Sequence, residues 1–318
     1  MQEKGSYMMG IAEQPLLWCG FLGFLLFMLG LDLFVFQKKA HVPSMREAIA
    51  FTLLWVCLAI VFCGGVYGFM GSRAALEFFG AYLIELALSV DNLFVFLTLF
   101  TFFGVPHAFR HRALFWGILG AILMRITFIL LGIHLVHRFA WLLYAFGALL
   151  IYTGIRFVFQ NNEQVEVKKN PVFRALERFL PITQGFDSGH FFLKVGRKWM
   201  VTPLFVVLVM IETTDIMFAL DSIPAVFGVT LNPFIAFSSN AFAILGLRAM
   251  YFALAGLMEL LRFLNYGLAL ILVFIGLKMI AGHFYEIPIL WTLGVIAGIL
   301  AVTTIASVLY PHRAHDPS

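Results

Sequence analysis

The hydrophobic and polar positions of this chain form long apolar runs that are separated by short polar segments. Each run is about 20 residues long, which is enough for one helix to cross a hydrocarbon core about 30 Å thick. Polarity does not alternate from residue to residue inside the runs, as it does in the strands of a membrane β-barrel. The pattern therefore predicts membrane-spanning helices at nine places, namely residues 15–36, 48–70, 78–104, 112–134, 139–159, 201–224, 234–257, 263–281 and 287–310.

Composition supports the same fold class. Apolar residues make up 62% and charged residues only 12% of the 318 positions, whereas a soluble domain carries about 25% charged residues. A chain with so few charges has too little polar surface to fold alone in water. We therefore expect residues 1–318 to form a single integral membrane domain in the cell membrane, an all-α bundle in contact with lipid.

The distribution of lysine and arginine predicts the orientation of the chain. Basic residues gather in every second connection between spans, and the longest of these, residues 160–200, holds seven of them. Because basic residues stay on the cytoplasmic side, we expect the N-terminus outside the cell and the C-terminus in the cytoplasm. The same bias explains the net charge of +4, so this charge does not require a nucleic-acid partner.

Residues 160–200 are the longest polar segment, and we expect them to form a cytoplasmic loop. Within this segment, Asn170 followed by Pro171 is a typical helix start. Apolar residues of the predicted helix share one face: Phe173, Leu176, Phe179 and Leu180. Two interpretations remain open, a helix on the inner membrane surface and a docking site for a cytoplasmic partner.

Acidic side chains within the third and sixth spans are the strongest functional signal. The third span contains Glu85 and Asp91, and the sixth contains Glu212, Asp215 and Asp221. Placing one ionised carboxylate at the centre of a membrane costs about 2.5 kcal/mol or more. Such side chains therefore indicate a path for ions or protons, or pairs with buried cations.

The two acidic spans also repeat a pattern. Glu85 and Asp91 are six residues apart, as are Asp215 and Asp221. Because the sixth span follows the third at an odd offset of three spans, the two copies cross the membrane in opposite directions. Inverted repeats of this kind build secondary transporters, whose ion site lies where the copies meet. We predict that the third and sixth spans lie side by side and antiparallel, and that Pro224 breaks the sixth span near Asp221.

Neighbouring polar residues complete a set of oxygen ligands. Asn92 directly follows an acid of the third span, and Asn240 lies in the seventh span. Carboxylate and amide oxygens suit hard or borderline divalent cations such as Mn²⁺, Mg²⁺ or Ca²⁺. Arg125, Arg248 and Lys278 lie within or near other spans, however. The acids could instead only pair with these cations and hold helices together, and both interpretations stay open.

Five segments of the chain resemble one known family. They are ELALSVDNLFVF (85–96), HRALFWGILGAILMRITFI (111–129), TPLFVVLVMIETTDIMFALDSIPAVFGVT (202–230), NPFIAFSSNAFAILGLRAMYF (232–252) and LALILVFIGLKMI (268–280). Over roughly residues 75–282 the chain resembles the TerC/Alx family of integral membrane proteins. The resemblance implies a multi-pass cell-membrane protein linked to tellurite resistance, alkaline response and manganese homeostasis, and built as an inverted-repeat exporter of divalent metal ions, notably Mn²⁺. The polar residues of these motifs form the candidate site: Glu85, Asp91, Asn92, Glu212, Asp215, Asp221 and Asn240.

Our hypothesis is a transporter that exports Mn²⁺ or a similar divalent cation. Asp91 and Asp221 would coordinate the ion from opposing repeats, aided by Asn92. The remaining acids would supply further ligands or carry a coupled proton, because carboxylates release protons as a metal binds. We expect no resident cofactor and no enzymatic activity, since the GxGD pattern of intramembrane aspartyl proteases is absent.

The alternative is a membrane partner protein that does not itself transport an ion. It would support the metal loading or secretion of other proteins through residues 160–200, with secreted proteins or secretion machinery as its partners. This alternative predicts that changes in the connection impair function more than changes in the intramembrane acids do.

Overall fold

The computed structural model describes residues 15–36, 44–159, 170–183, 185–186, 189–195, 198–254, 263–282, 285 and 287–309. Its helices and strands are α1 (Pro15–Phe36), α2 (Met45–Met70), α3 (Ser72–Phe102), α4 (His107–Arg138), α5 (Leu142–Phe159), α6 (Pro171–Phe179), β1 (Phe192–Val195), β2 (Lys198–Val201), α7 (Pro203–Phe227), α8 (Pro233–Leu254), α9 (Leu264–Ala281) and α10 (Ile289–Leu309).

The predicted polytopic helical fold is confirmed. Within the described residues, α1–α5 and α7–α10 occupy the nine predicted positions, with ends that shift by a few residues. Eight of them are long and apolar enough to cross a membrane, and α1 is an apolar helix of 22 residues. The last residues of two predicted spans, 255–257 and 310, lie outside the described residues, as do residues 160–169 of the predicted loop.

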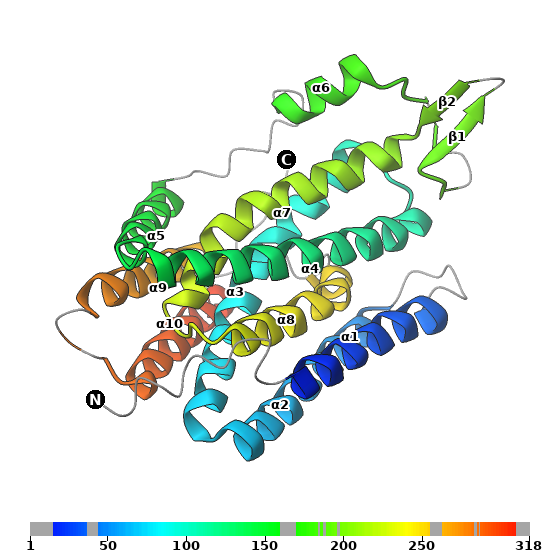
Figure 1. Cartoon of the computed structure of the whole chain (residues 1–318). Helices are drawn as coiled ribbons and strands as arrows, with labels where there is room; N and C mark the ends of the chain where they lie inside the picture. Colours follow the sequence, from blue (N-terminus) through cyan, green and yellow to red (C-terminus); the bar gives the residue numbers. More distant parts are fainter. Residues whose placement is uncertain are drawn as a thin grey trace.

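Helices α3 and α7, which carry the acidic motifs, contact each other in the interior of the bundle (Figure 1). Glu77, near the start of α3, accepts a hydrogen bond from Thr230, just beyond the end of α7. At the opposite ends, Phe103 and Pro203 line the same cavity. The two helices therefore lie side by side and antiparallel, as predicted.

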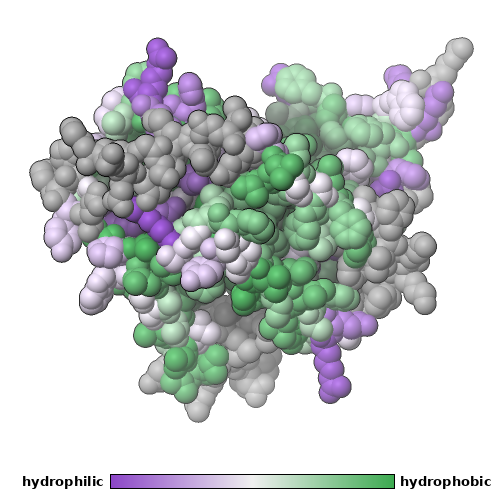
Figure 2. All heavy atoms as spheres, turned by 60° about the horizontal axis from the view of Figure 1, so that its bottom comes forward, coloured by the Kyte–Doolittle hydropathy of each residue, from purple (hydrophilic) through white to green (hydrophobic). Residues whose placement is uncertain are grey.

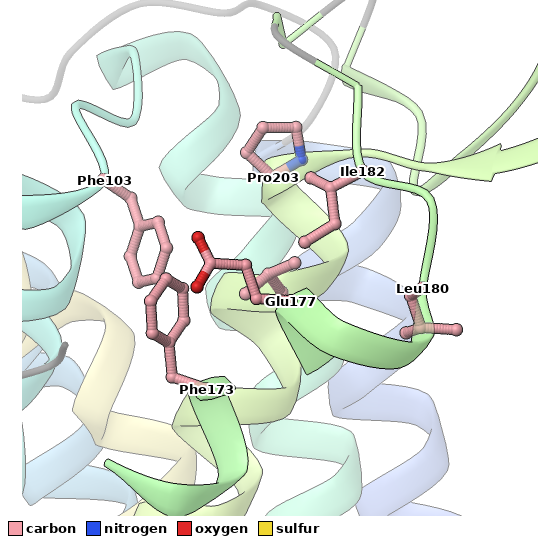
Figure 3. Close-up of a pocket in the computed structure, with 7 residues that line it drawn as sticks. Phe103, Phe173, Glu177, Leu180, Ile182 and Pro203 are labelled. Carbon is pink, nitrogen blue, oxygen red and sulfur yellow. The ribbon is translucent and has the colours of Figure 1, made fainter. Parts of the chain in front are cut away.

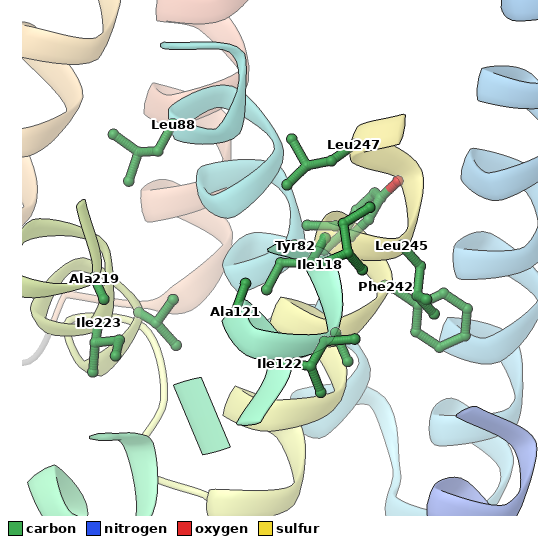
Figure 4. Close-up of a cluster of buried hydrophobic side chains, with 14 of the residues drawn as sticks. Tyr82, Leu88, Ile118, Ala121, Ile122, Ala219, Ile223, Phe242, Leu245 and Leu247 are labelled. Carbon is green, nitrogen blue, oxygen red and sulfur yellow. The ribbon is translucent and has the colours of Figure 1, made fainter. Parts of the chain in front are cut away.

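The other helices surround this central pair. Helices α4 and α8 contact each other, and α4 packs against α7 while α8 packs against α3. Helices α5 and α9 form a second pair beside α7. Helix α10 packs on α3 and α9, α2 packs on α3 and α8, and α1 packs on α8. Figure 4 shows part of the buried core, where Tyr82 of α3, Ile118 of α4 and Phe242 of α8 lie together.

The prediction that Pro224 breaks its helix is wrong. Helix α7 continues through this residue to Phe227. A proline removes the helical hydrogen bond that its own nitrogen would donate, and its ring pushes away the carbonyl four residues earlier, which can bend a helix without ending it. Pro224 also lies within one turn of the helix end, where its carbonyl still accepts from the Gly228 N–H at 3.0 Å. The loss of one bond so close to the terminus does not interrupt the helix.

Small residues allow α5 and α9 to pack backbone against backbone. A methyl group added at Gly276 would lie 2.5 Å from the carbonyl oxygen of Gly147, and one added at Gly154 would lie 2.7 Å from that of Ala269. Both pairs of small residues have a spacing of seven, so they stay on one face of each helix over two turns. Close approach over small residues is the usual way in which membrane helices associate, because lipid tails provide no hydrophobic drive.

Aromatic side chains attach α1 to the bundle. The buried face of α1 carries Trp18 and Phe21. The ring of Trp18 stacks on Phe237 of α8 at a centroid distance of 5.9 Å, and Phe21 meets Phe234 edge to face at 5.7 Å. Such pairs contribute about 1 kcal/mol each beyond the area that they bury. Outward-facing side chains of the bundle are themselves apolar, such as Phe69 of α2 and Trp291 of α10, and Figure 2 shows apolar residues over much of one face, as expected for contact with lipid.

The polar segment after α5 contains more structure than predicted. Helix α6 begins at the predicted position, where the side chain of Asn170 accepts from the Val172 N–H at 2.8 Å. It packs against α7, with Phe173 and Leu176 half-buried, whereas Phe179 is 76% exposed. The antiparallel hairpin of β1 and β2 was not predicted.

A cavity of about 400 Å³ lies between α6 and the bundle. Figure 3 shows the carboxylate of Glu177 directed toward the rings of Phe103 and Phe173. The remaining lining residues are apolar: Leu180, Ile182, Pro203 and Val206. The cavity lies at the α6 end of the bundle, and none of the acids of the spans is among the residues that line it.

Candidate ion site in the membrane core

A buried arginine joins four helices at the centre of the bundle. Arg125 of α4 is 1% exposed, and its guanidinium forms an ion pair with Glu85 of α3. Its Nη2 lies 3.3 Å from Oδ1 of Asp215 on α7, and its Nη1 donates at 3.0 Å to both Ser222 Oγ of α7 and Asn240 Oδ1 of α8. Asn240 Nδ2 donates to Glu85 Oε2 at 2.9 Å. We call these five residues the Arg125 network.

Helical spacing explains which acids join the network. Asn92 lies seven residues after Glu85, nearly two full turns, and so shares its face and is also buried. Asp91 lies six residues after Glu85 and therefore points about 120° away around α3. The same spacing directs Asp221 away from Asp215 on α7. Glu85 and Asp215 therefore belong to the Arg125 network, whereas Asp91 and Asp221 point away from it.

The Arg125 network leaves some of its hydrogen-bonding capacity unused. Two carboxylates, Glu85 and Asp215, face a single guanidinium. Among the described residues, two buried atoms of the network, Asp215 Oδ2 and Arg125 Nε, have no hydrogen-bond partner, and neither has Ser89 Oγ, one turn after Glu85 on α3. Unpaired buried polar atoms are rare in folded proteins because each one costs free energy that a hydrogen bond would recover. They therefore mark this network as a place where something further can bind.

Asp221 lies on the side of α7 that meets α5. Its Oδ1 accepts from Thr153 Oγ1 at 2.9 Å, and the residue is half-buried. Asp91 is also half-buried and shares the face of α3 that carries Leu88, which Figure 4 shows pointing away from α8. The prediction that Asp91 and Asp221 bind one ion together stays a prediction. The structure shows that neither belongs to the Arg125 network.

Glu212 lies beside Asp215 on α7 but is not one of the residues that contact Arg125. It lies three residues before Asp215, one turn along α7, and it is half-buried. Its carboxylate lies directly against Gly120 of α4, where any side chain would collide with it. The absence of a side chain at this glycine therefore provides room for a carboxylate between α4 and α7.

A second polar cluster lies at the ends of α3, α7 and α9. Glu77 accepts from Thr230 Oγ1 at 2.6 Å and from Arg73 Nε at 3.3 Å, while Lys278 Nζ donates to the carbonyl of Gly228 at 3.0 Å. Glu77 was not predicted as a buried acid, because it directly precedes the third predicted span. The apolar residues on both sides of Glu77 were the sequence feature that could have indicated its burial.

The two interpretations of the intramembrane acids are not exclusive. Glu85 and Asp215 do pair with Arg125, as the structural alternative requires. Lys278 instead bonds to a backbone carbonyl, and Arg248 is buried in α8. In the part of the chain that the structure describes, no group of three or more His, Cys, Asp or Glu side chains is gathered as a metal cage. An ion held here would need amide and hydroxyl oxygens as well as carboxylates.

Comparisons with known proteins place these observations in a family. The model of the integral membrane protein TerC family matches residues 70–315. A membrane protein of Myxococcus xanthus, STKORF319, is 45% identical over 300 residues, which cover 94% of each chain. The Escherichia coli (strain K12) protein Alx, whose name proposes a membrane-bound redox modulator, is 43% identical over 317 residues, which cover 97% of this chain and 98% of that protein. No solved structure matches.

Proposed function

This chain belongs to the integral membrane protein TerC family, and from that premise we propose that it exports Mn²⁺ or a similar divalent cation through its intramembrane carboxylates. The observation that carries the proposal is the Arg125 network, which gathers Glu85, Asp215 and Asn240 from three helices within a membrane bundle. Ionisable residues at this depth are costly, and they commonly mark ion and proton pathways.

The ligand chemistry favours a hard or borderline cation. The side chains that converge in the network offer carboxylate, amide and hydroxyl oxygens. Oxygen sets of this kind suit Mn²⁺ or Mg²⁺, whereas soft ions prefer thiolates. The thiols of the chain lie elsewhere: Cys63 donates to the carbonyl of Ala75 at 3.4 Å, and Cys19 and Cys57 are exposed on α1 and α2. We therefore base the proposal on carboxylates and not on the redox chemistry that the name Alx proposes for relatives.

The arrangement of helices supports alternating access by an inverted repeat. Each helix of the segment α3–α5 contacts its counterpart in α7–α9, as the pairs α3 and α7, α4 and α8, and α5 and α9. A two-fold axis in the membrane plane would produce these three contacts. Under this proposal, the transported ion binds in turn at the Arg125 network and at the Asp91 and Asp221 carboxylates.

The test of the proposal is to remove the two carboxylates outside the network. Asp91→Asn and Asp221→Asn keep the size of each side chain but remove a charged oxygen ligand. We expect each change to reduce Mn²⁺ efflux at least about ten-fold, measured in cells loaded with Mn²⁺, with unchanged membrane insertion. Glu177→Gln is the matched control, because it removes a carboxylate from α6 outside the spans. Efflux at the wild-type rate in both aspartate variants would refute this site assignment.

A second candidate function is the docking of a cytoplasmic partner. It is favoured by the cavity of about 400 Å³ between α6 and the bundle and by the exposed Phe179. Partner proteins commonly bind at exposed apolar side chains beside a hollow. This candidate would make the α6 region, and not the intramembrane acids, the functional surface.

Replacement of residues 161–169 by a neutral flexible linker, combined with Phe179→Ser, separates the two candidates. If the acids carry the activity, we expect Mn²⁺ efflux to stay within about two-fold of wild type, because polar connections outside a membrane tolerate change. The comparison is the manganese content of cells at matched protein levels, with Asp221→Asn alongside. A loss of function in the connection variant, together with wild-type behaviour of Asp221→Asn, would favour the docking protein.

A further inference from the structure

The Nη1 atom of Arg125 has more acceptors than hydrogens. A guanidinium Nη atom carries two hydrogens, yet three oxygens contact Nη1, from Glu85, Ser222 and Asn240. Four helices are held around this one atom and its neighbour Nη2, which faces Asp215. Oxygens surround this guanidinium as ligands surround a metal ion, although the cation here is a side chain of the protein.

The same oxygens could coordinate a divalent ion directly. Without the guanidinium, Glu85 Oε1, Asp215 Oδ1, Ser222 Oγ and Asn240 Oδ1 would face one another across the space that it fills. Two further buried oxygens, Asp215 Oδ2 and Ser89 Oγ, have no partner among the described residues. Ser89 lies one helical turn after Glu85 on α3, on the same face. Together with these two oxygens, the set would reach the six oxygen ligands that Mg²⁺ and Mn²⁺ prefer.

We propose that Arg125 is a tethered cation that occupies the ion site at rest and that the transported divalent cation must displace. This inference rests on the proposed export function and adds the residue that competes with the ion. The guanidinium and a divalent ion cannot share these oxygens, because they carry like charge and need the same acceptors. Binding of the ion and retention of Arg125 in the network are therefore mutually exclusive.

The chemistry of arginine suits this role. A guanidinium stays protonated at any physiological pH, so the site keeps a compensating charge whenever no ion is present. An empty site with two buried, unpaired carboxylates would be unstable, since removing one partner of a buried ion pair costs about 3–5 kcal/mol. Return of Arg125 after the ion leaves would restore the pairing and oppose rebinding. Arg125 Nε has no partner among the described residues, so displacement breaks only the Nη contacts.

The decisive experiment measures Mn²⁺ binding to the purified full-length protein through the loss of the electron paramagnetic resonance signal of free Mn²⁺. Arg125→Gln removes the tethered cation, and its amide can still donate to a carboxylate. We expect its Kd for Mn²⁺ to fall about ten-fold below that of the wild type, while transport slows because the ion is no longer displaced. Arg138→Gln removes an exposed arginine from the end of α4 and should bind Mn²⁺ as the wild type does.

A purely structural arginine would not oppose the ion, so folded Arg125→Gln protein with unchanged or weaker Mn²⁺ binding would overturn the inference. If Arg125→Gln does not fold, Arg125→Lys replaces it. Lysine keeps the charge but presents a single ammonium that cannot span both carboxylates, so its Kd should also fall below the wild-type value, and an equal Kd would contradict us. Wild-type protein that exports no Mn²⁺, together with tighter binding by Arg125→Gln, would refute the export function and leave the assignment of Arg125 standing. Export of Mn²⁺ by the wild type, without tighter binding by Arg125→Gln, would support the export function and refute the assignment of Arg125.

Discussion

Leucine in place of Gly276 is expected to separate α5 from α9 and to lower the free energy of unfolding by about 3 kcal/mol. The added Cβ alone would lie 2.5 Å from the carbonyl oxygen of Gly147 and 2.8 Å from the side chain of Ile151. The first of these atoms is backbone and cannot rotate away, so one helix must move. Thermal unfolding of the purified protein in detergent measures the loss.

The matched control for this change is Gly298→Leu. Gly298 lies in α10, and a Cβ added there meets nothing within 4 Å, so leucine would extend toward lipid at little cost. Equal melting temperatures for Gly276→Leu and Gly298→Leu would contradict the backbone packing of α5 on α9. We also expect Gly276→Leu to reduce Mn²⁺ efflux, because α5 carries Thr153, which donates to Asp221.

Replacement of Glu85 by glutamine is expected to abolish Mn²⁺ efflux while the protein still folds and inserts. The amide keeps the shape of the side chain, and Arg125 retains Asp215 as its ion-pair partner, so the cost in stability is smaller than for the removal of Arg125. A hard divalent cation, however, loses a charged oxygen ligand in the centre of the site. We expect a reduction of at least about 100-fold in efflux from cells loaded with Mn²⁺.

Glu77→Gln provides the control on the same helix. Glu77 bonds to Thr230 and Arg73 near the end of α3 and lies eight residues from Glu85, outside the Arg125 network. This variant should keep most of the efflux. Similar losses in Glu77→Gln and Glu85→Gln would mean that any buried carboxylate of α3 is needed for folding, and the special place of Glu85 would then be refuted.

The fold was accessible from sequence because the membrane restricts the possibilities. Only helices and closed barrels satisfy backbone polar groups in lipid, so apolar runs of the right length located nine helices within a few residues. The repeated six-residue spacing of acids also predicted the antiparallel contact of α3 and α7. The hairpin of β1 and β2 was missed because its two strands have four residues each, too few for a distinct pattern of polarity.

The sequence identified the acidic and amide residues of the candidate site, but not which of them lie together. Helical periodicity indicated that Glu85 and Asp91 cannot face one point, yet it could not show that Arg125, about 40 positions later in the chain, would approach Glu85. Contacts between helices depend on how their side chains interlock, and this packing is not encoded in the polarity of any single span. The sequence therefore identified Arg125 only as one of three basic residues available to pair with the acids.

The most direct measurement for the central claim is Mn²⁺ flux in liposomes that contain only this protein. Our account predicts saturable flux with the wild type, and flux in Glu85→Gln liposomes that does not exceed that of protein-free liposomes. Wild-type flux no greater than the protein-free background, or equal flux in wild-type and Glu85→Gln liposomes at matched protein content, would contradict it.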